Sequence, residues 1–321
     1  MKKKVLYIVI PCYNEEEVIN DTIEETCQLI DKLIAKKLID KDSKVLLVND
    51  GSKDNTWNII KKYYKSNKKV LGVSLSRNFG QQNAIMCGLM NAKEYADFTI
   101  TLDADLQDDI GCIEEMINKY YDGNEIVYGV RKSRKRDSFL KRVSAQLFYK
   151  FLKKLNKNTI YNHADFRLVS KEILNELALF EENNLYLRGL FPLIGFKSDI
   201  VYYERKQRQK GKTKYSWKKM FNLAIDGITS VSFQPIRLIF KIGIIIFLLS
   251  ILMIAYSVGA KIMGKTVSGW TFIVCSIWMI AGIQMLSLGI IGEYIGKIYS
   301  ESKKRPRYII EEQLLKDNNH D

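Results

Sequence analysis

Short apolar runs alternate with helical patterns over residues 1–210 of the chain. Five runs rich in Val, Ile and Leu predict β-strands, and the segments between them repeat apolar residues at helical spacing. This alternation predicts a mostly parallel sheet with helices on both faces. The predicted strands are Val5–Ile10, Lys44–Val48, Val70–Leu75, Phe98–Leu102 and Ile126–Val130, and the predicted helices are Glu16–Lys36, Asn55–Lys65, Gln81–Tyr95 and Ile110–Tyr121.

Two long uncharged segments, Ile242–Ala260 and Trp270–Gly292, follow this region. At about 1.5 Å rise per residue, each is long enough to cross a hydrocarbon core roughly 30 Å thick. Lys and Arg flank the pair on both outer sides, so the positive-inside rule predicts that both ends lie in the cytoplasm. A buried hairpin of a soluble helical domain is the alternative. Tyr215–Ile239 mixes apolar residues with lysines, which predicts a helix in the membrane interface or, alternatively, a core-facing helix.

The chain also carries a large excess of positive charge. Its 321 residues include 50 Lys and Arg against 36 Asp and Glu, a formal net charge of +14. Such an excess indicates a polyanionic partner, which could be nucleic acid, an anionic membrane face or a phosphorylated substrate. Many basic residues lie beside the apolar segments, which favours a membrane. The five cysteines form no CxxC pair, so a disulfide framework or zinc site is not expected.

Polar residues follow each of the first four predicted strands. They form the segments Pro11–Glu15, Asn49–Ser52, Ser76–Gly80 and Asp103–Asp109. In parallel α/β sheets, ligands bind at the carboxyl ends of the strands, so these segments are expected to line one site. The dinucleotide fingerprint GxGxxG and the P-loop GxxxxGK[ST] are both missing from the chain.

An Asp-x-Asp pair, Asp103 and Asp105, stands at the end of the fourth predicted strand. Carboxylate oxygens suit Mg²⁺ or Mn²⁺ bound to a diphosphate. Such an ion can neutralise the charge that develops on a departing nucleoside diphosphate. Asp108 and Asp109 are interpreted instead as acids that open the next helix.

Six motifs occur in a fixed order along the chain. They are IPCYNEE at Ile10–Glu16, VNDGSKD at Val48–Asp54, SRNFGQQ at Ser76–Gln82, LDADLQD at Leu102–Asp108, DFRLVS at Asp165–Ser170 and GKTKYSW at Gly211–Trp217. Together with the two apolar segments, they resemble the family-2 glycosyltransferases of GT-A fold, in the polyprenyl-phosphate branch that includes dolichol-phosphate mannose synthase. The resemblance covers nearly the whole chain.

The resemblance implies roles for individual residues. Asp105 matches the direct metal ligand, with Asp103 and Gln107 beside it, and Asp165 matches a base or acceptor-positioning carboxylate. Many relatives have two acids where this chain has Asn49-Asp50. Nucleotide-sugar contacts are implied for Pro11, Tyr13, Glu15, Asp50, Asp103, Lys212 and Lys214, catalytic roles for Asp105, Asp165 and Arg208, and lipid-phosphate contacts for Arg131, Arg134 and Arg136.

The expected organisation follows from the patterns and the resemblance together. Residues 1–210 are expected to form a cytoplasmic GT-A catalytic domain with a Rossmann-like α/β fold. Residues 211–240 are expected to form a basic loop and interface helix, 241–296 a two-helix transmembrane hairpin, and 297–321 a cytoplasmic tail. The resemblance implies a multi-pass protein of the bacterial cell membrane that assembles as a tetramer and has no nucleic-acid partner.

The expected reaction is inverting transfer of a hexose from UDP-glucose to undecaprenyl phosphate, with Mg²⁺ or Mn²⁺ as cofactor. UDP-N-acetylglucosamine or another nucleotide sugar is the alternative donor. A processive polysaccharide synthase is a second alternative, but Gln234–Arg237 lacks the Trp that completes its QxxRW motif. A non-catalytic, membrane-tethered nucleotide-binding module is the third.

Overall fold

The computed structural model describes residues 3–132, 163–182, 186–204 and 269–315, together with Ile245 and Met263. The chain divides into two compact units. The first comprises Met1–Ala224 with Pro306–Asp321, and the second comprises Ile225–Arg305. Each unit is described by itself below.

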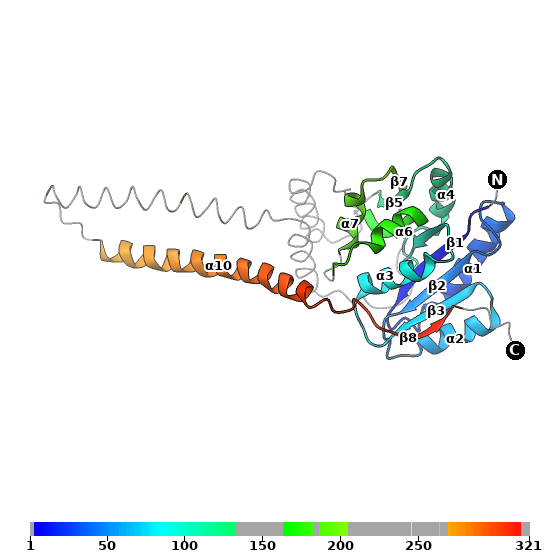
Figure 1. The fold of residues 1–321 in the computed structure, drawn as a ribbon, viewed down its shortest axis with the longest axis horizontal. Coiled ribbons are helices and arrows are strands. Elements are labelled where there is room, and N and C mark those ends of the chain that lie inside the picture. Colours follow the sequence, from blue (N-terminus) through cyan, green and yellow to red (C-terminus); the bar gives the residue numbers. More distant parts are fainter. Residues whose placement is uncertain are drawn as a thin grey trace. The chain divides into compact units, whose positions relative to one another are not determined.

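In the first unit, the described residues form one sheet of eight strands in the order β7-β5-β6-β4-β1-β2-β3-β8 (Figure 1). Parallel pairing joins β1 to β2 and β4, β2 to β3, and β5 to β7. β6 runs antiparallel to both β4 and β5, and β8 runs antiparallel to β3. The strands are β1 (Leu6–Cys12), β2 (Lys44–Asn49), β3 (Val70–Leu75), β4 (Phe98–Thr101), β5 (Ile126–Arg131), β6 (His163–Ser170), β7 (Ser198–Tyr203) and β8 (Ile310–Leu314).

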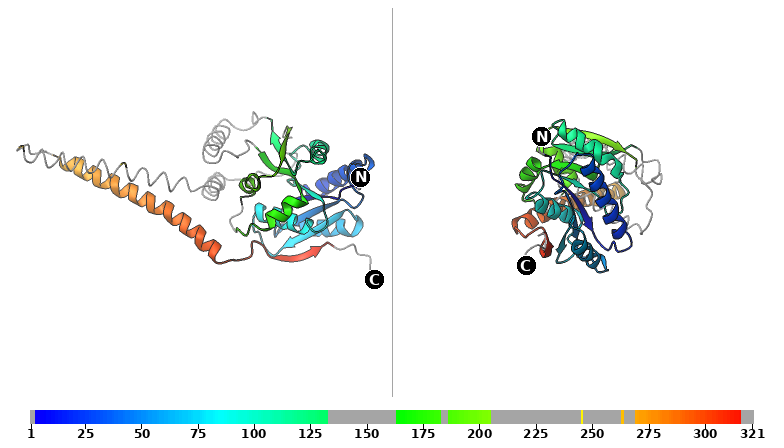
Figure 2. Two further views of the ribbon diagram at one scale, coloured as in Figure 1. Left: turned by 45° about the horizontal axis from the view of Figure 1, so that its top comes forward. Right: turned by 90° about the vertical axis from the view of Figure 1, so that its right-hand side faces the viewer.

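Helices cover both faces of this sheet (Figures 1 and 2). Alternate residues of β1 belong to different cores: Leu6, Ile8 and Ile10 to one, Tyr7 and Val9 to the other. Both faces exclude water, which explains the nearly continuous apolar runs of the central strands. The first core includes α1 (Ile19–Ala35), α2 (Thr56–Ser66) and α4 (Ile113–Tyr121), and the second includes α3 (Gln81–Ala92), α6 (Lys171–Ala178) and α7 (Leu187–Ile194).

The structure confirms the five strands and four helices predicted within residues 1–210, with ends that shift by less than one helical turn. The helix predicted at Ile110–Tyr121 begins as a 3-10 turn, η1 (Ile110–Cys112), and continues as α4. Three strands and two helices were not predicted individually: β6, β7, β8, α6 and α7.

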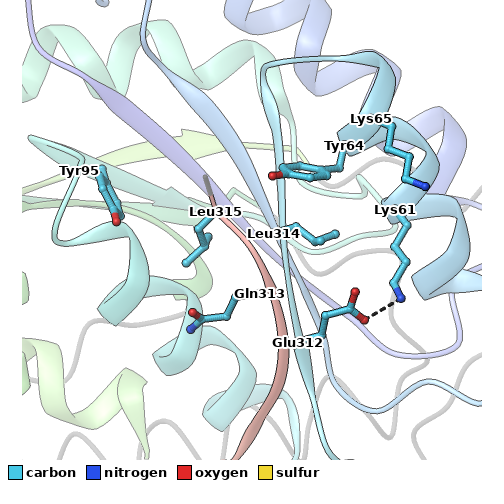
Figure 3. Close-up of a pocket in the computed structure, with 8 residues that line it drawn as sticks. All are labelled: Lys61, Tyr64, Lys65, Tyr95, Glu312, Gln313, Leu314 and Leu315. Atoms are coloured by element: carbon cyan, nitrogen blue, oxygen red, sulfur yellow. Dashed lines mark ion pairs between the residues drawn. The ribbon is translucent and has the colours of Figure 1, made fainter. Parts of the chain in front are cut away.

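The strand β8 lies in a segment that the sequence presents as a tail. It pairs with the edge of β3, and the Ser76 amide donates a hydrogen bond to the Ile309 carbonyl at 3.0 Å. Glu312 accepts from Trp57 Nε1 at 2.8 Å and pairs with Lys61 Nζ at 2.7 Å. A cavity of about 510 Å³ lies between α2 and this strand (Figure 3). β8 therefore covers the edge of β3 and is itself the outermost strand on this side of the sheet.

In the second unit, the apolar segment Trp270–Gly292 lies in one continuous helix, α10 (Trp270–Ser302). None of the helices in the described ranges combines the length and the apolar character that a bilayer crossing requires. The structure therefore does not support the membrane crossing predicted at Trp270–Gly292. The crossing predicted at Ile242–Ala260 and the interface helix predicted at Tyr215–Ile239 lie outside the described residues.

Candidate active site

The loops that follow β1 and β2 are bound to each other. The Asn14 amide donates to Ser52 Oγ at 2.9 Å, and the Lys53 amide donates to Asn14 Oδ1 at 2.8 Å. The Glu15 amide donates to Thr56 Oγ1 at 2.9 Å. These contacts hold Pro11–Glu15, the segment predicted to contact the nucleotide, against the loop that follows β2. Its specific contacts by Pro11, Tyr13 and Glu15 stay predictions.

Asp50 connects the loop that follows β2 to the loop that follows β3. Its carboxylate is buried and accepts the backbone N–H groups of Phe79 at 2.7 Å and Gly80 at 3.0 Å. Burial raises the pKa of Asp50, and the two backbone hydrogen bonds only partly offset this effect. Gly51, with φ of +63°, lies so close to the Arg77 backbone that a Cβ would fall 2.3 Å from the Arg77 carbonyl carbon. Asp50 thus orders the Ser76–Gly80 loop, and its predicted contact with the base stays a prediction.

Asn49 has a structural role in this chain. Its Nδ2 donates to Ser74 Oγ at 2.9 Å, and its Oδ1 accepts from the Ser52 amide at 3.1 Å. A neutral amide can both donate and accept here, whereas a carboxylate could only accept. The turn therefore offers hydrogen-bond partners for an Asn side chain at the position where many relatives have an acid.

Asp103 and Asp105 lie at the carboxyl end of β4, as predicted. Asp103 Oδ1 accepts from Gln81 Nε2 at 2.8 Å, and Asp105 Oδ1 accepts from the Gln107 amide at 3.2 Å. Leu106, which lies between Asp105 and Gln107 in the chain, adopts a positive φ of 45°. Burial, followed by the negative charges of Asp108, Asp165 and Asp105, raises the pKa of Asp103 to about 7. Negative charge therefore accumulates at this strand end.

The chemistry of these residues fits a divalent cation. Within the described ranges, no group of three His, Cys, Asp or Glu side chains is placed to enclose a metal ion. Mg²⁺ commonly binds through one or two carboxylates and completes its shell with water and substrate phosphates. Asp103 and Asp105 can supply those carboxylates, and a cation there would relieve the repulsion that raises the pKa of Asp103. Gln107 as an added ligand stays a prediction.

Asp108 corrects the interpretation made from the sequence. Asp109 does open the next helix, since its carboxylate accepts from the Gly111 amide at 3.2 Å. Asp108 is instead buried, accepts the Tyr203 hydroxyl, and lies 3.5 Å from Arg131 Nη2. Its Oδ2 has no hydrogen-bond partner among the described residues. Periodicity at a helix start could not distinguish these two neighbouring acids.

Asp165 is held by two arginines. Its Oδ1 accepts from Arg167 Nη2 and from Arg188 Nε, both at 3.0 Å, and its Oδ2 accepts from Arg188 Nη2 at 2.9 Å. Both carboxylate oxygens therefore contact guanidinium groups, an arrangement that suits orientation better than proton abstraction. Arg188 was not predicted from the sequence. The available signal was that Arg188 is the only charged residue in the apolar helix Leu187–Ile194.

Asp105, Asp165 and Arg131 thus all lie within electrostatic reach of Asp103 at the end of β4. The loops that follow β1, β2 and β3 lie next along the sheet. The other predicted basic residues lie outside the described residues: Arg134, Arg136, Arg208, Lys212 and Lys214.

Comparison with known proteins identifies the family. The model of glycosyl transferase family 2 matches residues 7–178, and that of the GtrB C-terminal hairpin matches residues 234–298. The chain belongs to glycosyl transferase family 2. The α/β, GT-A part of the expected fold and the expected enzyme class are thereby confirmed: the protein is a glycosyltransferase with a GT-A-type mixed sheet.

Curated relatives of this glycosyltransferase align over nearly its full length. The uncharacterized glycosyltransferase YkoT of Bacillus subtilis is 50% identical over 98% of this chain and 93% of its own length. The bactoprenol glucosyl transferase of Shigella phage SfV is 36% identical over 96% of this chain and 99% of its own. The prophage bactoprenol glucosyl transferase homolog of Escherichia coli is 38% identical over 94% and 97%.

Similarity to solved structures is more distant. A glucosyl-3-phosphoglycerate synthase of Mycobacterium tuberculosis, solved with phosphoglyceric acid, aligns with 71% of this chain and 79% of its own at 15% identity and a TM-score of 0.48. A likeness at this level carries no conclusion about substrate or mechanism.

Proposed function

We propose that this glycosyltransferase moves glucose from UDP-glucose to undecaprenyl phosphate with Mg²⁺ or Mn²⁺ and inversion at the anomeric carbon. The full-length similarity to proteins named bactoprenol glucosyl transferase carries the proposal, because it supports both the sugar and the lipid acceptor. We also propose that residues 234–298, which match the GtrB hairpin, hold the enzyme at the cytoplasmic face of the bacterial membrane, where the acceptor lies.

The arrangement of the site supports a reaction between two anionic substrates. The ordered loops after β1, β2 and β3 are suited to the nucleotide, and the carboxylates at the end of β4 lie next along the sheet. Arg131 ends β5, on the other side of β4. A nucleotide over β1 to β3 and a phosphate near β5 would therefore approach the Asp103–Asp105 pair from opposite sides.

Each part of the site then has a defined task. A bound divalent cation would stabilise negative charge on the departing diphosphate. Asp103 and Asp105 would hold that cation, while arginines bring the acceptor phosphate to the sugar. A phosphate monoester has a second pKa near 6 and is largely ionised at neutral pH. The acceptor therefore needs little deprotonation, which agrees with an Asp165 that is fully engaged by arginines.

A donor panel tests this proposal. The purified full-length protein in detergent is given undecaprenyl phosphate, Mn²⁺ or Mg²⁺, and separately UDP-glucose, UDP-N-acetylglucosamine, UDP-galactose and GDP-mannose. The proposal predicts a glucosyl lipid from UDP-glucose at a rate well above the others. Preferential use of another sugar would refute the donor assignment, and metal-dependent nucleotide-sugar binding without any lipid product would instead favour a binding module.

A further inference from the structure

Two arginines near the acidic strand end are each held by a buried carboxylate. Arg188 makes a bidentate pair with Asp165, with N···O distances of 3.0 and 2.9 Å. Arg131 donates from Nε to the Tyr203 hydroxyl oxygen at 3.1 Å and lies 3.5 Å from Asp108. These contacts orient both guanidinium groups, which lowers the entropy cost of ordering them around a ligand.

Exposure distinguishes Arg188 from its neighbour Arg167. Arg167 has a side chain 2% exposed that donates to the carbonyls of Ala164 and Leu187, both at 3.3 Å, and lies 4.5 Å from the centre of the Phe191 ring. Arg188 has a side chain 29% exposed. Arg167 therefore fixes Asp165 and the start of α7 within the core, whereas Arg188 is the arginine of this pair that a ligand can reach.

The first turn of α7 is tied to the strand ends. The Leu187 amide donates to Gln82 Oε1 at 3.1 Å, and Gln82 follows directly after Gln81, which contacts Asp103. β6 runs antiparallel to β4, so Asp165 near the start of β6 lies beside the carboxyl end of β4, where Thr101 Oγ1 donates to the Asp165 carbonyl. Arg188 is thereby placed at the same strand end as the Asp103–Asp105 pair.

The electrostatic surroundings agree with this placement. Burial lowers the pKa of Arg131, but its neighbours Tyr203 and Asp108 outweigh that effect and raise it overall, while the charge of Arg188 opposes it. Val130, next to Arg131, pairs with His163, two residues before Asp165 in β6. Arg131 and the Arg188–Asp165 pair therefore lie at the same end of these two strands, where the like charges of the two arginines repel each other. Shared contact with an anionic phosphate would relieve the repulsion.

We propose that Arg188 binds the phosphate of the acceptor together with Arg131, for which the resemblance already implies this contact. Asp165 and Asp108 are then positioning residues for these two arginines. Sheet order separates this pair from the loops predicted to bind the nucleotide, because β5 and β6 lie on one side of β4 while β1, β2 and β3 lie on the other. The inference rests on the proposed function for the identity of the acceptor. It also gives Asp165 a task other than that of a general base.

Binding measurements on the full-length protein in detergent test the inference. Arg188→Ala is expected to weaken binding of undecaprenyl phosphate by roughly tenfold to a hundredfold, the effect of losing one or two charge-assisted hydrogen bonds. Its affinity for UDP with Mn²⁺ is expected to stay within about twofold of the unmodified protein. Arg188→Lys is expected to recover only part of the loss, because a lysine cannot form the bidentate pair with Asp165. The control is Lys171→Ala, which removes an exposed positive charge at the start of α6.

Asp165→Asn distinguishes a positioning residue from a base. As a positioning residue, its loss raises the KM for undecaprenyl phosphate more than it lowers kcat, and leaves the shape of the pH–rate profile unchanged. Loss of the acidic limb of that profile, with an unchanged acceptor KM, would overturn the role given to Asp165.

The outcomes separate this inference from the proposed function. Unchanged acceptor affinity in Arg188→Ala, or a loss of UDP affinity instead, would refute the Arg188 assignment even if glucose is transferred. An unmodified protein that binds undecaprenyl phosphate through Arg188 but transfers no glucose would refute the proposed function and leave the assignment standing. Thermal unfolding of each variant checks that the fold is intact.

Discussion

Gly51→Ala is the sharpest test of how the nucleotide-side loops are built. Gly51 has φ of +63°, and an added Cβ would lie 2.3 Å from the Arg77 carbonyl carbon and 2.6 Å from the Asn78 amide nitrogen. Left-handed backbone costs a non-glycine residue about 1–2 kcal/mol. Overlap with backbone atoms that cannot move aside adds about 1–3 kcal/mol. The expected destabilisation is therefore about 2–5 kcal/mol.

Thermal unfolding followed by intrinsic fluorescence measures this effect. A loss of that size is expected to lower the Tm by roughly 5–15 °C, and the affinity for UDP is expected to fall because the two loops separate. Gly195→Ala is the matched control: it has φ of +79°, but its Cβ would meet nothing nearer than the Leu193 carbonyl oxygen at 3.9 Å. It is expected to lose only about 1–2 kcal/mol. Equal Tm values for the two variants would refute the close packing of these loops.

Two further predictions concern buried and partly buried carboxylates. Tyr203→Phe removes the hydroxyl shared by Asp108 and Arg131. We expect the free energy of unfolding in urea to fall by about 1–3 kcal/mol, and undecaprenyl phosphate to bind more weakly while UDP binding is unchanged. Unchanged stability and unchanged acceptor affinity would contradict this prediction. Hydrogen bonds from Thr56 outweigh burial and lower the pKa of Asp54, so its contribution to stability is present above its unfolded pKa of about 3.9 and is lost as the pH falls through its lower folded value. Asp54→Asn is therefore expected to flatten the decline of urea stability between roughly pH 5 and pH 3, and an unaltered slope would contradict this.

The sequence predicts the strands β1 to β4 well because their signals are local. β2 contains the continuous apolar run Val45–Val48, and β3 is apolar except for Gly72 and Ser74, since helices cover both faces of the sheet. The ligand edge could be predicted as well, because parallel strands carry their carboxyl ends to one edge. The motif around Asp103 and Asp105 therefore lies where the pattern indicated.

The elements that were missed depend on tertiary contacts. The strand Ile310–Leu314 has the composition of a polar tail, and it forms because β3 offers an unpaired edge and Trp57 and Lys61 contact Glu312. In the sequence, Asp108 resembles an acid at the start of a helix. In the structure it accepts a hydrogen bond from Tyr203, which lies on a strand distant in sequence. The role of Arg188 depends on its contact with Asp165, and local periodicity in the sequence cannot show that these two residues pair.

The most direct measurement of the central claim is metal-dependent glucosyl transfer by Asp105→Asn compared with the unmodified protein. Undecaprenyl phosphate and UDP-glucose are supplied with increasing Mn²⁺. Asp109→Asn is the matched control, because the Asp109 carboxylate accepts from the Gly111 amide and the Cys112 thiol at the start of η1. Loss of a charged ligand that acts in the transition state is expected to lower kcat by about a hundredfold or more, with an unchanged Tm. Normal transfer by Asp105→Asn at low Mn²⁺ would contradict the claim that the carboxylates at the end of β4 hold the catalytic cation.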